Sequence, residues 1–176
     1  MSTATTNSAT ADQVRPALAP AAKAATFLLF SGELDKQLMA FTLANSAAAS
    51  GMPVTLFFTF WSLAALRKPA SARGKGLIDR MFGWMLPRDS RALPMSNLNF
   101  GGFGPKLIRW RMRRRGVASL EQQIATARAL GVRFVVCETS MDLMGFRREE
   151  LLAGVAFGGA TECVDEAARA RIAMVI

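Results

Sequence analysis

Continuous apolar runs alternate along the chain with segments of helical periodicity, and this alternation predicts strands and helices in turn. The run at 24–30 predicts a first strand, and apolar positions at helical spacing follow it over 33–50. Gly51 and Pro53 end that helix, and the apolar run 54–58 predicts a second strand. Because a strand, a helix and a strand fit into about 35 residues, we expect a βαβ unit and a parallel sheet.

The same alternation returns after residue 118. Ser119 and Gln122 have the spacing of a capping box, which predicts the start of a helix that ends before Gly131. The elements expected after it are a strand at 132–136, short helical pieces at 140–144 and 147–152, a strand at 155–157, a helix capped by Thr161 that runs to about Arg169, and a strand at 172–176. These elements predict the α/β fold class.

Between the two regions lies a strongly basic segment. Residues 67–118 hold thirteen Lys and Arg against two acidic residues, a local net charge of +11, whereas the rest of the chain has a net charge of −2. The segment interrupts the alternation of strands and helices, so we interpret it as an insertion after the second strand. Within it we expect a helical stripe over 77–85, a loop over 100–105 and a basic amphipathic helix over 106–115.

The first 22 residues are rich in Ala, Ser, Thr and Pro, so they predict a flexible tail ahead of a single domain over 23–176. They lack the basic start and the apolar core of a signal peptide. The stretch from Gln37 to Leu66 carries no charge, but polar residues, Gly51 and Pro53 interrupt it. A buried helix and strand are therefore favoured over a membrane span.

The residue types that the chain lacks exclude several kinds of catalytic and metal-binding site. The chain has no His, which excludes Ser-His-Asp and Cys-His catalysis and most zinc sites, and we expect neither a metal nor a cofactor. Two Cys are too few for a secreted disulfide scaffold, which favours a reducing cytoplasm. The best-placed nucleophile is Cys137, because it stands where a predicted parallel strand passes into a helix, and α/β proteins bind ligands at that edge.

Some residues around Cys137 stabilise its thiolate form and others destabilise it. The N-terminus of the following helix favours the charged form, and Thr139 and Ser140 are candidates to donate hydrogen bonds to the sulfur. Glu138 and Asp142 disfavour the thiolate, because they place negative charge nearby. From position alone, a buried packing residue is an equal alternative.

The other candidates have stronger structural alternatives. Cys163 follows the fourth strand and is a candidate second thiol, although acidic neighbours favour a core role. Met141 and Met144 could form a polarizable wall beside the sulfur, but core packing is preferred. A cluster of basic residues beside Trp110 consists of Arg109, Arg111, Arg113, Arg114 and Arg115. It could bind an anionic membrane face or an acidic partner, and nucleic acid is less favoured. The alternative is that these residues form a solvated helix face.

Several segments taken together resemble one protein family. They are 30–36, 51–61, 81–83 with Pro87, 101–104, 149–151 and, above all, Cys137 with 140–145. On these segments the chain resembles the DsrE/DsrF-like sulfur-transfer family. The likeness is to its larger subfamily with an insertion after the second strand, sometimes labelled peroxiredoxin-like, and it extends from about residue 26 onward.

The resemblance implies a three-layer α/β/α fold around a central, mainly parallel five-stranded sheet. It implies that Cys137 holds sulfur as a persulfide, next to a motif that ends at Gly145, and that the protein forms oligomers and exchanges sulfur with TusA-like or rhodanese-like carriers. Glu138 and Thr139 depart from the Thr-Met that often follows this cysteine, and no role carries over to Cys163. The predicted function is a cytoplasmic sulfur relay, as enzyme or carrier. The alternative is a scaffold protein that docks on an anionic membrane face or a partner through the basic segment.

Overall fold

Five strands form one sheet in the computed structural model, which describes residues 22–68 and 86–176. In spatial order they are β4 (Ala156–Gly158), β3 (Arg133–Cys137), β2 (Val54–Phe58), β1 (Ala22–Leu29) and β5 (Ala170–Val175). Each strand runs parallel to its neighbours. The parallel sheet predicted from the βαβ pattern is confirmed.

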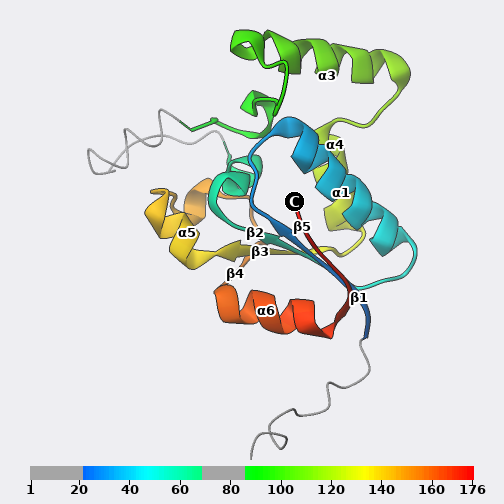
Figure 1. Cartoon of the computed structure of the whole chain (residues 1–176), viewed down its shortest axis with the longest axis vertical. Helices are drawn as coiled ribbons and strands as arrows, with labels where there is room; N and C mark the ends of the chain where they lie inside the picture. The colour runs from blue at the N-terminus through cyan, green and yellow to red at the C-terminus, as the bar shows by residue number, and fades with distance from the viewer. Residues whose placement is uncertain (1–21, 69–85) are drawn as a thin grey trace, which may run out of the picture.

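Helices cover both faces of the sheet (Figure 1). On one face α1 (Leu34–Ala49) packs beside α4 (Leu120–Ala129), and α6 (Ala160–Arg169) crosses the other face. Right-handed crossovers explain this division, because the chain steps from β1 to β2 to β3 in one direction and returns from β4 to β5 in the other. The three layers confirm the predicted α/β/α fold class.

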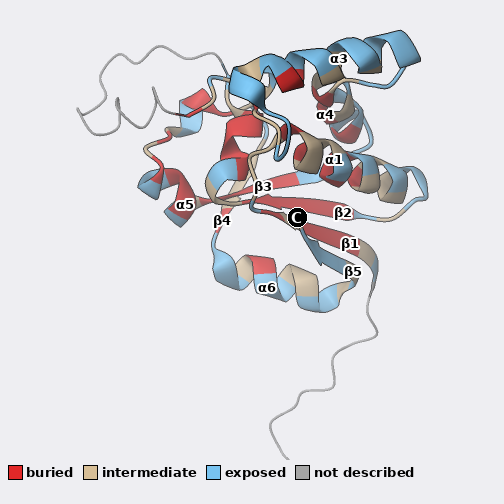
Figure 2. Cartoon of the chain, turned by 45° about the horizontal axis from the view of Figure 1, so that its top comes forward, coloured by how far each residue is buried: buried red, intermediate tan, exposed pale blue. Residues whose placement is uncertain are grey.

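Alternation along β3 divides its side chains between the two faces. Phe134 and Val136 point into the main core beneath α1 and α4, where the Phe134 ring lies 5.7 Å, centroid to centroid, from the rings of Phe41 and Phe58. Val135 and Cys137 point the other way and belong to a smaller cluster with α6. Figure 2 shows the buried residues concentrated in the strands and on the inner sides of the helices.

The chain between β2 and α4 contains short helices and one longer one. They are η1 (Phe60–Leu66), η2 (Ser90–Ala92), η3 (Phe100–Gly102) and α3 (Phe103–Arg115). The stripe predicted over 77–85 lies outside the described residues. The predicted tail does too, apart from Ala22, which begins β1.

The loop predicted over 100–105 is wrong, because α3 already begins at Phe103. Pro105 fits the first turn of a helix, where its missing N–H has no intrahelical partner to lose. Gly101 and Gly102 take the positive φ angles, 63° and 93°, that let the chain turn into α3.

Two other helices begin earlier than predicted. α5 (Glu138–Leu143) starts directly after Cys137, which has the extended backbone of an N-cap residue. The N-cap of α6 is Gly159 instead of Thr161, which lies inside the first turn. The capping box of α4 is confirmed, since Gln122 N–H donates to Ser119 Oγ at 3.3 Å and Ser119 N–H donates to Gln122 Oε1 at 2.8 Å.

The uncharged stretch 37–66 forms most of α1, then β2 and η1. Over residues 22–68 and 86–176, no helix is both long and apolar enough to cross a bilayer. The predicted choice of a buried helix and strand over a membrane span is therefore consistent with the fold.

Candidate functional site

Cys137 is the last residue of β3, and α5 begins immediately after it. In the sheet it lies opposite Gly158, the last residue of β4. Both strands are parallel, so the two residues stand at the carboxyl edge of the sheet, where α/β folds place their chemistry. The residue is 8 % exposed, so only a small part of it reaches the surface. The position predicted for it at a strand end is confirmed.

The surroundings of the Cys137 side chain are mostly apolar. It packs in the small cluster with Phe57 of β2, Val135 of β3 and Cys163 of α6. Both cysteines are free thiols. Gly158 leaves room for a carboxylate here, because a Cβ at that position would lie 2.0 Å from Glu162 Oε2. The two cysteine side chains thus belong to one buried cluster between the sheet and α6.

The carboxylate that follows Cys137 has a cationic partner. Glu138 forms an ion pair with Arg148 of η4 (Arg148–Glu150), whose guanidinium lies 4.1 Å from the centre of the Phe157 ring. The sequence suggested that Glu138 disfavours a thiolate at Cys137. Its ion pair with Arg148 places a positive charge beside that carboxylate and so offsets part of its effect on the thiol. The sequence alone does not show which cation pairs with Glu138.

The hydroxyl of Ser140 has a partner other than the sulfur. Its Oγ lies 2.7 Å from Thr59 Oγ1, at the end of β2, and the thiol of Cys137 makes no capping bond to α5. Thr139 is exposed. The Thr59–Ser140 contact instead fixes the first turn of α5 against the neighbouring strand, so Thr59 is a supporting residue that the sequence analysis missed. An isolated Thr after an apolar strand carries no signal that would have revealed it.

Met141 and Met144 are buried in the main core and do not belong to the cluster around Cys137. The preferred interpretation of these residues as core packing agrees with their placement. Gly145 ends α5 with a φ of 67°, and the N–H of Phe146 bonds back to the carbonyl of Met141 at 3.0 Å. This is a Schellman turn, which requires a left-handed residue and so favours glycine.

Cys163 is poorly suited to be the first nucleophile. Burial raises the pKa of its thiol, and the nearby Cys137, Glu166 and Glu162 raise it further. Arg133 forms ion pairs with both Glu162 and Glu166. The thiol form is therefore favoured at neutral pH, as the acidic neighbours in the sequence suggested.

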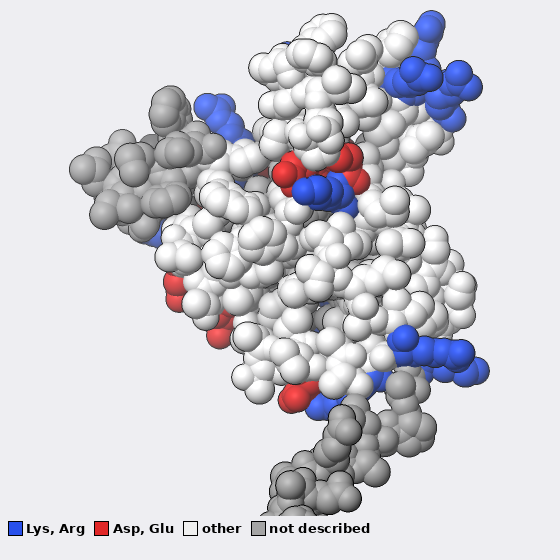
Figure 3. Space-filling model, viewed as in Figure 1, with Lys and Arg blue, Asp and Glu red and all other residues white. Residues whose placement is uncertain are grey.

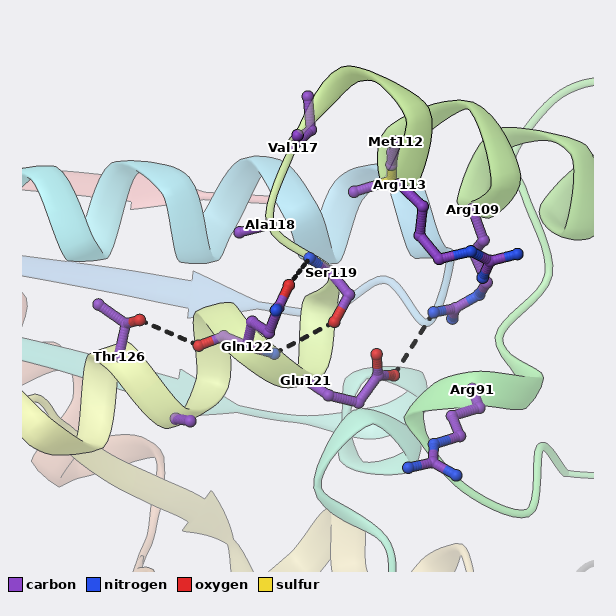
Figure 4. A pocket seen from close by; sticks show the side chains of 12 residues that line it. Arg91, Arg109, Met112, Arg113, Val117, Ala118, Ser119, Glu121, Gln122 and Thr126 are labelled. Carbon is purple, nitrogen blue, oxygen red and sulfur yellow. Dashed lines mark hydrogen bonds and ion pairs between the residues drawn. The ribbon is translucent and has the colours of Figure 1, made fainter.

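The five arginines predicted to form a cluster beside Trp110 do not all face the same way. Arg109 faces a cavity of about 970 Å³ between α3 and α4 (Figure 4), where it donates to the carbonyl of Ser90 at 2.6 Å and pairs with Glu121 at 3.4 Å. The other four are exposed; they are Arg111, Arg113, Arg114 and Arg115. Arg109 therefore acts in joining α3 to the body of the protein, and the exposed arginines remain available to a partner.

We expect Glu121→Gln to weaken the attachment of α3 in a pH-dependent way. Burial raises the pKa of Glu121, but hydrogen bonds from Ser90, the backbone and Ser119, together with the charge of Arg109, outweigh it and lower the pKa overall. Because folding lowers the pKa of Glu121, its charged carboxylate stabilises the folded protein above the ordinary carboxyl range. That stability is lost as the pH falls through the lowered pKa of the folded state. The variant should lose about 1 kcal/mol of unfolding free energy at neutral pH.

The measurement is urea unfolding of the wild-type protein and Glu121→Gln from neutral pH into the acidic range. The difference between them should shrink as the wild-type carboxylate becomes protonated. A difference that stays constant with pH would contradict the charged network in Figure 4.

The parallel sheet, the helices on both of its faces and a cysteine at the end of an inner strand define a three-layer α/β protein. A model of the DsrE/DsrF/DrsH-like family matches residues 21–175, and the chain belongs to this family, as its resemblance predicted. It is 39% identical over 155 residues to YrkE of Bacillus subtilis (strain 168), covering 88% of this chain and 97% of that protein.

Two further similarities complete the comparison. The chain is 30% identical over 152 residues to the sulfur carrier protein DsrE2 of Allochromatium vinosum, covering 82% of this chain and 92% of that protein. The crystal structure of the ychN protein from E. coli matches with a TM-score of 0.50 at 13% identity, over 87% of this chain and 99% of that one. The latter similarity is one of fold.

Proposed function

We propose that this protein carries sulfane sulfur as a persulfide on Cys137 and passes it to or from a carrier protein. The observation that carries the proposal is the position of Cys137, the last residue of an inner strand at the carboxyl edge of the sheet. Membership of the DsrE/DsrF/DrsH-like family and the similarity to a sulfur carrier protein support it.

The chemistry requires a thiolate but no histidine. In loading, the Cys137 thiolate attacks the outer sulfur of thiosulfate, a new S–S bond forms, and sulfite departs with the electron pair of the old one. In delivery, the thiolate of a carrier attacks the outer sulfur of the persulfide, and the Cys137 thiolate is the leaving group. Each step exchanges one S–S bond for another, so neither step needs an added oxidant or reductant.

The surroundings of Cys137 suit a stored persulfide. The apolar neighbours Phe57 and Val135 limit access of water, and the ion pair of Glu138 with Arg148 reduces electrostatic repulsion of an approaching anion. A protein acceptor of the TusA-like or rhodanese-like kind would present its own thiol at the carboxyl edge of the sheet. Two free cysteines fit a reducing compartment, so the proposed relay is placed in the cytoplasm.

The test is intact-protein mass spectrometry after incubation with thiosulfate or polysulfide. We expect the wild-type protein to gain the mass of sulfur and to lose it again with a reductant. Cys137→Ser should gain none, and Cys163→Ser is the matched control, because it removes the neighbouring buried thiol but should keep loading.

Each outcome decides the proposal. If loading is lost in Cys163→Ser and kept in Cys137→Ser, the wrong sulfur has been assigned. If the folded wild-type protein gains no sulfur and Cys137 reacts with an alkylating reagent only after unfolding, Cys137 is a packing residue. Circular dichroism of both variants shows whether a loss of loading reflects a loss of structure.

A further inference from the structure

Helix α3 presents an exposed apolar stripe on the side turned away from the protein body. In its first turn only Gly104 and Pro105 are buried, whereas Phe103, Leu107 and Trp110 are 65 %, 48 % and 46 % exposed. These three residues recur at spacings of four and three, which places them on one helical face. Figure 1 shows α3 at the edge of the molecule, and in Figure 2 most of it has the colour of exposed residues.

The opposite face of α3 is the one that packs on the protein. Ile108 and Met112, four residues apart, are half-buried, and Arg109 is held by Glu121 and Ser90. The exposed apolar side chains therefore have no role in attaching α3 to the described part of the chain. Large apolar side chains gathered on one exposed face indicate a surface that contacts something else.

Cations border the stripe on both sides. Lys106 and Arg113 lie along one flank and Arg111 and Arg115 along the other, by their spacings of seven and four. Arg114 continues the stripe and lies 4.8 Å over the Trp110 ring. Figure 3 shows Lys and Arg side chains gathered where α3 ends.

No acidic residue interrupts this surface. The chain between Asp89 and Glu121 holds seven Lys and Arg and no Asp or Glu. The outer face of α3 is therefore defined as Phe103, Leu107, Trp110 and Arg114 with the four flanking cations.

We propose that the outer face of α3 docks this protein on an anionic lipid bilayer. An apolar stripe between rows of cations is the pattern of a helix that lies in the membrane interface, with its aromatic side chains among the acyl chains and its arginines at the phosphates. With thirteen residues α3 is about 20 Å long, which is too short to span a bilayer but suits a helix lying flat.

A second copy of this chain fits the same surface less well. Two outer faces of α3 packed together would bring eight to ten arginine and lysine side chains of like charge into contact, roughly doubling the charge on one face. The carboxylates of α6 that could compensate are already in ion pairs, Glu162 and Glu166 with Arg133 and Asp165 with Arg169. Anionic lipid offers both an apolar interior and many phosphates, which satisfies the two parts of the surface at once.

Vesicle co-sedimentation of the full chain tests the proposal. The wild-type protein should bind vesicles of phosphatidylcholine with phosphatidylglycerol and not vesicles of phosphatidylcholine alone, and added salt should weaken the binding. Arg111→Gln combined with Arg115→Gln should weaken it about five-fold for each charge removed. The matched control is Arg169→Gln with Arg171→Gln, which removes two exposed arginines at the end of α6 and the start of β5 and should bind like the wild type.

The apolar stripe has its own readout. Leu107→Ala should weaken binding, and a blue shift of tryptophan fluorescence on addition of anionic vesicles should disappear in Trp110→Phe. Cys137→Ser should bind vesicles like the wild type, which separates this proposal from sulfur loading.

Three results would overturn the proposal. The first is that the wild-type protein stays in the supernatant with anionic vesicles, and the second is that it binds neutral vesicles equally well. The third is that the wild type binds no vesicles and forms an oligomer, which Leu107→Ala converts into a monomer. The last result would identify the outer face of α3 as a contact between copies of the chain.

Discussion

Glu150→Ala should destabilise the protein by about 3–5 kcal/mol, because it removes the carboxylate of a buried ion pair with Arg67. Arg67 Nη2 lies 3.4 Å from Glu150 Oε2, and the two side chains are only 8 % and 4 % exposed. The Arg67 guanidinium also donates to the carbonyl of Pro87 at 3.2 Å and lies 5.3 Å from the centre of the Phe146 ring. With its carboxylate removed, this charge cannot reach water without breaking those contacts.

The pair joins two parts of the chain that flank the site. Lys68 N–H donates to the Glu150 carbonyl at 2.7 Å, and Leu152 N–H donates to the Leu66 carbonyl at 2.9 Å. The end of η1 is thereby fastened to the connection that leads from α5 to β4. Loss of the pair should therefore loosen the surroundings of Cys137 as well as lower overall stability.

A double variant separates the effect of the two charges from the effect of the packed volume of the two side chains. Arg67→Met combined with Glu150→Leu removes both charges and keeps apolar volume, so it should recover most of the stability lost in Glu150→Ala. Guanidinium unfolding of the wild type, the single variant and the double variant measures both effects. If Glu150→Ala loses less than about 1 kcal/mol of unfolding free energy, the pair is hydrated and contributes no more than a surface ion pair.

Local patterns in the sequence were sufficient for most of the fold. The β-branched and apolar runs predicted all five strands within a few residues. The signal is strongest for the inner strands β2 and β3, which are buried on both faces and therefore almost entirely apolar. The order of the strands was not predictable in the same way. The position of β5 next to β1 depends on α6 crossing the far face of the sheet, and no local pattern records that path.

The site shows the same division between local and tertiary information. Cys137 was predicted because the strand and the turn after it are local signals. The contacts that surround it join residues far apart in the chain, as Thr59 and Ser140 do, or pair side chains across a turn, as Glu138 and Arg148 do. Arg109 was grouped with its neighbours because charge density in sequence does not reveal which arginine faces Glu121.

Phe58→Ala should cost about 3–5 kcal/mol of unfolding free energy, because it opens a cavity at the centre of the main core. The Phe58 ring is fully buried and lies 6.1 Å from Phe41 and 5.7 Å from Phe134, centroid to centroid. These rings connect α1, β2 and β3, so the layer between the helices and the sheet depends on them. Truncation removes both the buried area and the aromatic contacts.

Two variants control for this effect. Phe58→Leu keeps most of the volume and should cost no more than about 1.5 kcal/mol, and Phe103→Ala removes an exposed ring and should change stability by about 0.5 kcal/mol or less.

Phe58 immediately precedes Thr59, which contacts Ser140 in the first turn of α5. If the proposed persulfide site depends on the position of that turn, Phe58→Ala should load sulfur on Cys137 more slowly at temperatures where it remains folded. Loading at the wild-type rate would show that the reactivity of Cys137 does not depend on packing in the main core.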